Sequence, residues 1–458
     1  MKKIIVLGGG PGGVAAAIRA SQLGAEVTLV ESTHVGGVCM NQGCIPLRVL
    51  GSTAEAAATI NRAADLGLKA GQAKLNIEQL KARLADAVNY MRMGTEGLLQ
   101  SNRIRIVRGQ GKLLPSGEVK VGQESLAAEA VILATGADWK RPDIPGADLK
   151  EVVTSDELLA DLNIPKRLVV LGGRPWSIEL AAFYHRFGAQ VTLAAPGRFL
   201  PEVDRQISNR LRSLLKGEGL NLLIQAEPTG IKKVKTGLEV SLTLKGKEEK
   251  IATDKVLITE RAPRLEGLGL EEAGVKMADK AVKVNGQLQT DNPRLFALGD
   301  LIGEPLLSHK ASAQGVVAAE NALGAKKTFD SSVIPRVLYT IPEVAAVGLT
   351  EKEAKAQGHE VVVGEIPYGV NARAMAELSA DGFVKIVCGA RYGEVLGVHV
   401  LGPHSAELIS QAALAIQLEA TARELAQVVA PHPSFAEALV DAARMALGQA
   451  LYVPKQSG

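Results

Sequence analysis

Two of the three cysteines in this 458-residue chain, Cys39 and Cys44, lie five positions apart in GGVCMNQGCIP, residues 36–46. Such a pair could bind a metal, form a buried structural pair, or form a redox disulfide. Zinc would need two further Cys or His ligands, and His34 is the only neighbour, so we expect no metal site. A helix-like stretch follows the cysteines, and a helix N-terminus favours a thiolate. These residues favour a redox pair over inert thiols.

A second pair of chemical interest lies near the C-terminus. In APHPSFAEALV, His432 and Glu437 are five residues apart on either side of a proline-containing turn. Histidine suits proton transfer near neutral pH, and a carboxylate can orient its ring. A lone His-Pro turn with an acid nearby is more often a surface turn, so these residues alone leave both interpretations open.

The element before the cysteines predicts a dinucleotide site. Residues 4–31 indicate a buried strand, a glycine turn, a helix and a second strand that ends in an acid. Gly8, Gly10 and Gly13 fill the G-x-G-x-x-G positions, which provide a tight turn, close approach to a pyrophosphate and helix–strand packing. Glu31 stands where an acid would bind ribose hydroxyls. The pattern predicts a complete dinucleotide-binding βαβ unit.

Residues 167–195 repeat this strand–turn–helix–strand pattern with different residues at the key positions. Gly172 keeps the first glycine, whereas Arg174 occupies the second glycine position and Ser177 the third. Ala195 stands where the terminal acid would be. We therefore expect the same local fold with an altered nucleotide site.

The rest of the chain completes an α/β fold. The strand-like RLFALGD ends at Asp300, which could serve a nucleotide or simply cap the following helix. After about residue 330, strands and helices alternate without glycine fingerprints, which predicts an appended α+β domain. We expect two Rossmann-like dinucleotide-binding domains and a C-terminal α+β domain. Their expected bounds are 1–148, 149–268, 269–328 for a central segment returning to the first domain, and 329–458.

Composition excludes several classes of protein. With 3% aromatic residues and a net charge of +3 without long basic runs, the chain lacks the pattern of a nucleic-acid binder. It has no apolar run of the length that a membrane span needs, and a glycine cluster interrupts the signal-like N-terminus. Three cysteines in so long a chain are typical of a reducing compartment, so we expect a cytoplasmic protein.

Seven motifs in one order resemble the class I flavin-dependent pyridine nucleotide:disulfide oxidoreductases, and most closely their dihydrolipoamide dehydrogenase branch. The resemblance runs the whole length of the chain. The motifs are GGGPGG with its distal acid, GGVCMNQGCIP, ILATG, the second nucleotide unit, LFALGD, YTIPEVAAVGLTE and HPSFAEA.

The resemblance implies an enzyme that oxidises a lipoyl-type dithiol, with FAD as the bound carrier and NAD as the acceptor. It implies that Cys39 is the interchange thiol, that Cys44 lies against the flavin as a thiolate, and that His432, oriented by Glu437, is the base. The implied FAD-site residues are Gly8, Gly10, Gly13, Glu31, Arg48, Thr135, Gly136, Glu179 and Asp300.

The same resemblance implies partners. In the family the His–Glu pair enters the active site of the other subunit, so a homodimer is expected, with residues 330–458 as its interface. A lipoyl-carrying protein of a multienzyme system is the expected second partner. Neither nucleic acid nor membrane is expected.

The chain departs from the family pattern beside the flavin. GCIPLR replaces GCIPSK, so Leu47 and Arg48 stand for serine and lysine. The relatives' lysine pairs with a glutamate, which Glu179 matches, so we expect an Arg48–Glu179 pair. Arginine keeps the charge but has a different shape and hydrogen-bonding geometry.

Further departures fall in the second nucleotide site. Trp176 follows Arg174 in the region that relatives use beside the nicotinamide, and Glu260 replaces a glycine of their A-x-G-R-x-P motif. Two interpretations stay open: Arg174 binds the pyrophosphate and Glu260 is merely exposed, or the site is partly occluded. For the second, we expect Arg174 and Glu260 to attract each other across this site. Ala195 replaces the acid that would bind an NAD ribose, and the paired arginines of NADP-dependent relatives are missing. The sequence therefore specifies neither NAD nor NADP. An occluded site serving another acceptor, a reductase of another small disulfide, and a non-catalytic FAD-bearing subunit remain alternatives.

Overall fold

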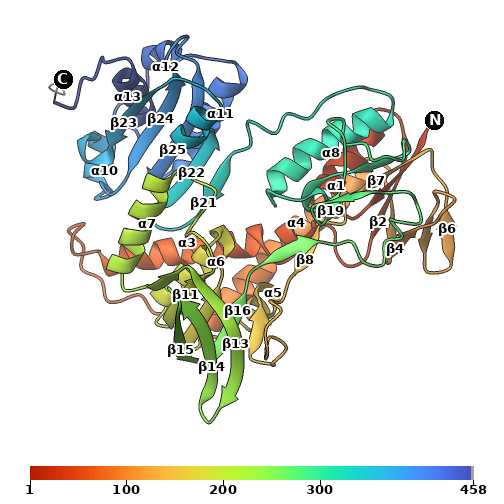
Figure 1. Ribbon diagram of the computed structural model, residues 1–458, viewed down its shortest axis with the longest axis horizontal. Helices are drawn as coiled ribbons and strands as arrows, with labels where there is room; N and C mark the ends of the chain where they lie inside the picture. The colour runs from red at the N-terminus through yellow and green to blue at the C-terminus, as the bar shows by residue number, and fades with distance from the viewer. Residues whose placement is uncertain (455–458) are drawn as a thin grey trace.

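Three lobes meet around two long helices, α3 (Cys44–Asn61) and α4 (Ile77–Ser101), in a computed structural model that describes residues 1–454 (Figure 1). The N-terminal strands and the late helix α8 (Ser308–Ala322) share one lobe. The yellow to light-green segments of the middle of the chain form the second lobe, and the blue C-terminal segments form the third. No helix within the described residues is long and apolar enough to cross a membrane.

A five-stranded parallel sheet forms the centre of the first lobe, in the order β20-β7-β1-β2-β3. Its inner strands are rich in buried Val, Ile and Leu, as expected of a sheet covered on both faces. The predicted βαβ unit is confirmed, because β1 and β2 pair in parallel on either side of helix α1 (Pro11–Gln22). The strands are β1 Lys3–Leu7, β2 Glu26–Glu31, β3 Arg105–Arg108, β7 Ala130–Leu133 and β20 Leu295–Ala297.

The pairing of β20 with β7 returns the chain to the first sheet after the second lobe. Helix α8 then packs against α1 at two glycines. A Cβ atom added to Gly315 would lie 2.3 Å from the carbonyl oxygen of Gly12, so the helices approach at backbone distance. The domain bounds remain predictions. The lobe's remaining elements are β4 Gly111–Leu113, β5 Val119–Val121, β6 Glu124–Leu126, β18 Met277–Ala278, β19 Ala281–Val282, α2 Gly37–Asn41 and the 3-10 helix η1 Gly299–Ile302.

The second lobe repeats the architecture with a parallel sheet in the order β12-β11-β10-β16-β9. The second predicted βαβ unit is confirmed in β10, α6 and β11. The elements are β9 Val152–Thr154, α5 Ser155–Asp161, β10 Arg167–Leu171, α6 Pro175–Arg186, β11 Gln190–Ala195, α7 Arg205–Gly217, β12 Asn221–Ile224, β13 Ala226–Val234, β14 Gly237–Leu244, β15 Lys247–Thr253 and β16 Lys255–Ile258.

Two short strands connect these lobes. β8 (Ala137–Trp139) leaves the first lobe, β17 (Arg261–Pro263) leaves the second, and they pair antiparallel. This pairing brings the segment after Glu260 against the segment after Gly136. Residues from both dinucleotide units can therefore contact one another where the lobes join.

The C-terminal lobe is an antiparallel sheet with helices packed on it, which confirms the predicted α+β character. All seven residues of β24 are buried, consistent with its place inside the sheet. The elements are β21 Arg336–Leu338, β22 Glu343–Gly348, α9 Glu351–Ala356, β23 Val361–Pro367, η2 Tyr368–Val370, α10 Ala372–Ala376, β24 Phe383–Gly389, β25 Val395–Gly402, α11 Ser405–Gln417, α12 Ala422–Gln427 and α13 Ala436–Ala446.

Candidate active site

The cysteine pair lies on two consecutive helices. Cys39 is in α2, and Cys44 is the first residue of the long helix α3, as the sequence predicts. Both are free thiols, and both are partly buried. Cys44 Sγ lies 3.7 Å from the hydroxyl of Ser308, at the start of α8. Packing of α8 on the first sheet therefore supplies a hydroxyl beside the redox segment.

The two thiols differ in acidity. A hydrogen bond from Cys39, reinforced by Ser308 and by the positive charge of Arg261, lowers the pKa of Cys44 to about 7 against the opposing effect of burial. The shared hydrogen bond and burial raise the pKa of Cys39 above its usual range. In the reduced pair, Cys44 is the thiolate and Cys39 keeps its proton.

The first glycine turn forms an open cradle at the N-terminus of α1. A Cβ atom on Gly8 would lie 2.3 Å from the carbonyl oxygen of Ala134, and one on Gly13 would lie 1.8 Å from that of Gly8. These two glycines permit close packing. A Cβ on Gly10 would meet, among residues 1–454, only Gly37 Cα at 4.0 Å. Gly10 thus faces open space where a phosphate group could approach the helix N-terminus.

Glu31 is buried beside this turn. Its carboxylate accepts hydrogen bonds from the Gly9 N–H at 2.7 Å and from the Thr33 N–H at 2.8 Å. The acid at the end of β2 therefore fixes the glycine turn. Its predicted contact with a ribose stays a prediction.

Thr135, Gly136 and Asp300 lie where the lobes join. The hydroxyl of Thr135 is buried and has no hydrogen-bond partner within the described chain, and Gly136 has a positive φ of 77°. Asp300, in η1, forms a 2.9 Å ion pair with the buried guanidinium of Arg261, which also donates to the Ala137 carbonyl. Tertiary structure thus gives Asp300 a cationic partner from the second lobe.

The turn of the second unit differs from the prediction. Arg174 does not pair with Glu260. Its Nη1 lies 2.8 Å from Glu304 and 3.4 Å from Glu202. Glu260 is exposed beside the β8–β17 pairing, where its carbonyl oxygen accepts the Lys140 N–H. The expectation was wrong because Arg174, at the N-cap of α6, reaches the first lobe instead of the end of β16.

Gly172, Ser177 and Ala195 pack tightly around the glycine turn of the second unit. Gly172 has a φ of 137°, and a Cβ there would lie 2.4 Å from the Ser177 hydroxyl. Ser177 is buried and shares a 2.7 Å hydrogen bond with Thr259. Ala195 is buried, and its Cβ would lie 2.7 Å from a Cβ added to Gly173. Small side chains allow this tight contact between the turn and β11.

Trp176 lies between the second unit and the redox segment. Its indole N–H donates to Ser155 at 2.8 Å, and its ring meets Trp139 edge-on with centroids 5.2 Å apart. A Cβ on Gly43, next to Cys44, would lie 2.7 Å from the Trp176 ring. Trp176 therefore packs tightly against the start of α3.

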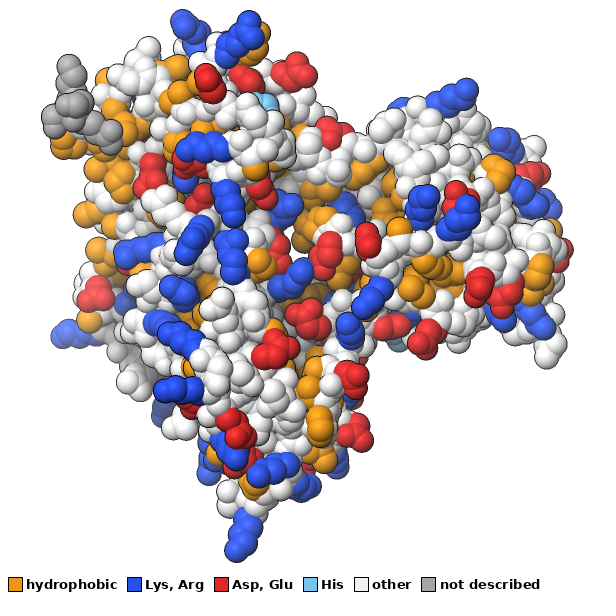
Figure 2. Space-filling view, in the orientation of Figure 1, with side chains coloured by type: hydrophobic (Ala, Val, Ile, Leu, Met, Phe, Trp, Pro, Cys, Tyr) orange, Lys and Arg blue, Asp and Glu red, His pale blue; other side chains and the backbone are white. Residues whose placement is uncertain are grey.

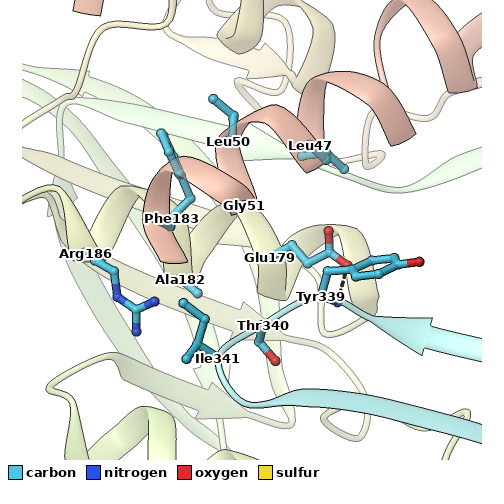
Figure 3. A pocket seen from close by; sticks show the side chains of 11 residues that line it. Leu47, Leu50, Gly51, Glu179, Ala182, Phe183, Arg186, Tyr339, Thr340 and Ile341 are labelled. Atoms are coloured by element: carbon cyan, nitrogen blue, oxygen red, sulfur yellow. Dashed lines mark hydrogen bonds between the residues drawn. The ribbon is translucent and has the colours of Figure 1, made fainter. Parts of the chain in front are cut away.

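The expected Arg48–Glu179 ion pair does not form. Arg48 extends along α3 to Glu55, at 2.8 Å, and its guanidinium lies 4.5 Å from the centre of the Tyr339 ring. Glu179, on α6, accepts the backbone N–H of Tyr339 at 2.9 Å (Figure 3). The expectation was wrong because the aromatic ring and an acid on its own helix hold the guanidinium.

Glu179 lines a cavity of about 30 Å³ between α3, α6 and the loop after β21 (Figure 3). Burial raises the pKa of its carboxyl to about 7, although the Tyr339 hydrogen bond and the charge of Arg48 oppose this shift. A carboxyl group that changes protonation near neutral pH therefore lies on α6, the helix that also carries Trp176.

His432 and Glu437 form the predicted pair. The Nδ1 of His432 lies 2.9 Å from Glu437 Oε1, and the other carboxylate oxygen accepts the Ser434 N–H. The His432 side chain is 71% exposed and Glu437 only 22% exposed. The carboxylate thus orients the ring and leaves Nε2 open to solvent or to another molecule.

The sequence interpretation missed several residues at this junction. They are Ser308, Arg261, Trp139, Tyr339, Glu202 and Glu304. Arg261, as the arginine of the altered A-x-G-R-x-P motif, had a usable signal. The others come from separate segments with no shared spacing.

Comparison with known proteins agrees with this arrangement. Residues 2–315 match the model for pyridine nucleotide-disulphide oxidoreductases, and residues 334–443 match that family's dimerisation domain. Dihydrolipoyl dehydrogenases of Thermus scotoductus and Bacillus subtilis are 40% and 36% identical to this chain, each match covering 98% of both proteins. A leghemoglobin reductase of Vigna unguiculata is 35% identical over 96% of this chain and 86% of its own length.

The fold has a solved counterpart as well. The crystal structure of LpdA from Mycobacterium tuberculosis superposes with a TM-score of 0.90 at 27% identity, over 97% of this chain and 99% of that one. The family models together cover most of the chain, including both glycine turns, the cysteine pair and the His432–Glu437 pair. The chain belongs to the pyridine nucleotide-disulphide oxidoreductase family.

Proposed function

We propose that this protein is a dihydrolipoyl dehydrogenase, which oxidises a protein-bound dihydrolipoyl group and passes the electrons to NAD. The observation that carries the proposal is the unequal cysteine pair at the start of α3, with Cys44 acidic and Cys39 not. The two full-length relatives named as dihydrolipoyl dehydrogenases support the substrate class.

The residues around the first glycine turn fit FAD. Gly10 leaves open space at the N-terminus of α1, and the buried hydroxyl of Thr135 lacks a partner among residues 1–454. We assign the diphosphate to the turn formed by Gly8, Gly10 and Gly13, and the ribose of the ADP half to Glu31. Asp300 is assigned to the ribityl or pyrophosphate part of FAD. When bound, the flavin carries two electrons from the reduced cysteine pair to the nucleotide.

The difference in acidity assigns the cysteine roles. In the oxidised protein, a substrate thiolate attacks Cys39 of the Cys39–Cys44 disulfide, because Cys44 is the better leaving thiolate. The second substrate thiol then attacks the substrate sulfur of this mixed disulfide and releases Cys39. The substrate leaves as a cyclic disulfide, and its two electrons remain on the cysteine pair.

His432 serves as the base in this step. Glu437 binds Nδ1, which leaves Nε2 free to take a proton from the incoming thiol. The His432 ring is exposed in a single chain, which suits a base that acts in the active site of a second subunit. The match to a dimerisation domain supports a homodimer. A lipoyl-carrying protein is the proposed substrate partner. The cytoplasm is the proposed location, because three cysteines in a 458-residue chain are too few for the disulfide framework of a secreted domain.

The experiment is anaerobic mixing of the FAD-loaded protein first with dihydrolipoamide and then with NAD, while the flavin spectrum is recorded. We expect dihydrolipoamide to reduce the flavin and NAD to reoxidise it. Failure of the first step would refute dithiol oxidation and favour a non-catalytic subunit. Success of the first step with failure of the second would indicate a different acceptor.

A further inference from the structure

Three charged side chains meet at the turn of the second dinucleotide unit. Arg174 lies between Glu304, at 2.8 Å, and Glu202, at 3.4 Å. Charged side chains also gather around the hollow where the three lobes meet (Figure 2). Glu304 comes from the loop between η1 and α8, so this contact joins the second unit to the first lobe.

The position of the cluster is that of a phosphate site. Arg174 is the N-cap of the twelve-residue helix α6 and fills the glycine position where a backbone would approach a dinucleotide's diphosphate. A helix N-terminus and a guanidinium together attract an anion. In this structure, the carboxylates of Glu304 and Glu202 take the place of such an anion at that guanidinium, and Glu304 lies nearer.

The two acids are not equivalent. The Glu202 side chain is 21% exposed, and its Oε2 is buried without a hydrogen-bond partner within residues 1–454. A buried carboxylate needs the nearby cation, so Glu202 anchors Arg174. Glu304 is 55% exposed, and an exposed ion pair is weak. Glu304 is therefore the partner that an incoming anion can displace.

We propose that Glu304 determines nucleotide affinity by competing with the dinucleotide's diphosphate for Arg174. When the nucleotide binds, Arg174 exchanges Glu304 for the diphosphate and stays beside Glu202. This inference rests on the proposed function only in taking a nicotinamide dinucleotide as the ligand of the second unit. Arg174 is then an anion-binding residue. In the absence of nucleotide, its guanidinium is occupied by a carboxylate of the same chain.

The test is calorimetric titration of the FAD-loaded protein with ADP-ribose, which carries the diphosphate without the reactive ring. Glu304→Gln removes the competing charge. The glutamine keeps a side-chain oxygen that can accept the Leu306 N–H, as the Glu304 carboxylate does at 3.3 Å. We expect this variant to bind ADP-ribose roughly threefold to tenfold more tightly than the wild type. In an Arg174→Ala background the same change should give no gain, because the shared partner is absent.

The matched control is Glu218→Gln, which removes the 2.9 Å ion pair with Arg186 at the other end of α6 and should leave ADP-ribose affinity unchanged. Equal or weaker binding by Glu304→Gln, an equal gain without Arg174, or no binding by either protein would overturn the proposal. Flavin reduction by dihydrolipoamide without nucleotide is measured separately. Its failure would refute the proposed function, while the titration would still decide the role of Glu304.

Discussion

At the scale of single residues, the acidity of Cys44 decides which sulfur is attacked in the mechanism that we propose. The pKa of Cys44 is lowered to about 7 chiefly by the hydrogen bond from Cys39, so its thiolate forms near neutral pH. The third cysteine, Cys388, is buried, and burial raises its pKa to about 12. One thiol of the reduced protein should therefore react far faster than the others.

We predict that alkylation of the reduced protein by iodoacetamide increases with pH around a midpoint of about 7. Ser308→Ala should move the midpoint upward, because Ser308 stabilises the thiolate. Cys388→Ser is the control and should leave the profile unchanged. A midpoint near 9.0, the ordinary thiol value, would contradict the assignment.

The base can be tested at the same scale. General-base catalysis typically contributes about 10²–10⁴-fold, so His432→Gln should slow dihydrolipoamide oxidation by roughly that factor with FAD content unchanged. Glu437→Gln should have a smaller effect, since it orients the ring through Nδ1. Unchanged turnover in His432→Gln would place the base elsewhere.

At the scale of elements, the packing of α3 against α6 explains the behaviour of Glu179. The glutamate lines a small cavity between these helices, and Arg48 is turned toward Glu55 and Tyr339. Without a salt-bridge partner within 4.0 Å among the described residues, burial dominates and raises its pKa from 4.5 to about 7.

This raised pKa predicts a pH-dependent stability. Between about pH 4.5 and 7 the unfolded chain has lost the Glu179 proton and the folded protein has kept it, so stability falls as pH rises through this window. Glu179→Gln should remove the loss and stabilise the protein by roughly 3 kcal/mol above about pH 7, and by little near pH 4.5.

The measurement is the thermal unfolding midpoint of wild type and variant across that pH range. Glu55→Gln is the control, because Glu55 is an exposed partner of the same arginine. A Glu179→Gln difference that does not change with pH would show that the carboxyl is ionised throughout.

At the scale of the whole molecule, the cysteines and His432 belong to different lobes. Cys39 and Cys44 lie at the start of α3, whereas His432 precedes α13 in the lobe that matches the dimerisation domain. The His432 imidazole is exposed and held by one carboxylate, which suits the action in a second copy of the chain that we propose.

We predict complementation between two inactive variants. Cys39→Ser lacks the proposed interchange thiol, and His432→Gln lacks the proposed base. A mixed dimer of the two should regain one functional site, formed by the cysteines of one chain and the histidine of the other. Co-expression with two affinity tags isolates this dimer for the dihydrolipoamide assay. Mixed dimers as inactive as the parent variants would place His432 at its own chain's site.

The sequence alone determined the features that depend on local geometry. Gly8 and Gly13 permit contacts that no side chain would allow, so the first turn was readable from glycine spacing. The cysteine pair at a helix start followed from its neighbours in the chain, as did the order of the βαβ units and the C-terminal α+β lobe.

Only the tertiary structure decided the partners of the long charged side chains. Arg174 pairs with Glu304, 130 residues away, and Arg48 turns to Glu55 instead of Glu179. A guanidinium on a flexible stem can reach any acid that folding brings nearby, and near the surface the alternatives differ little in energy. The choice therefore depends on how separately formed lobes pack, which spacing along the chain does not encode.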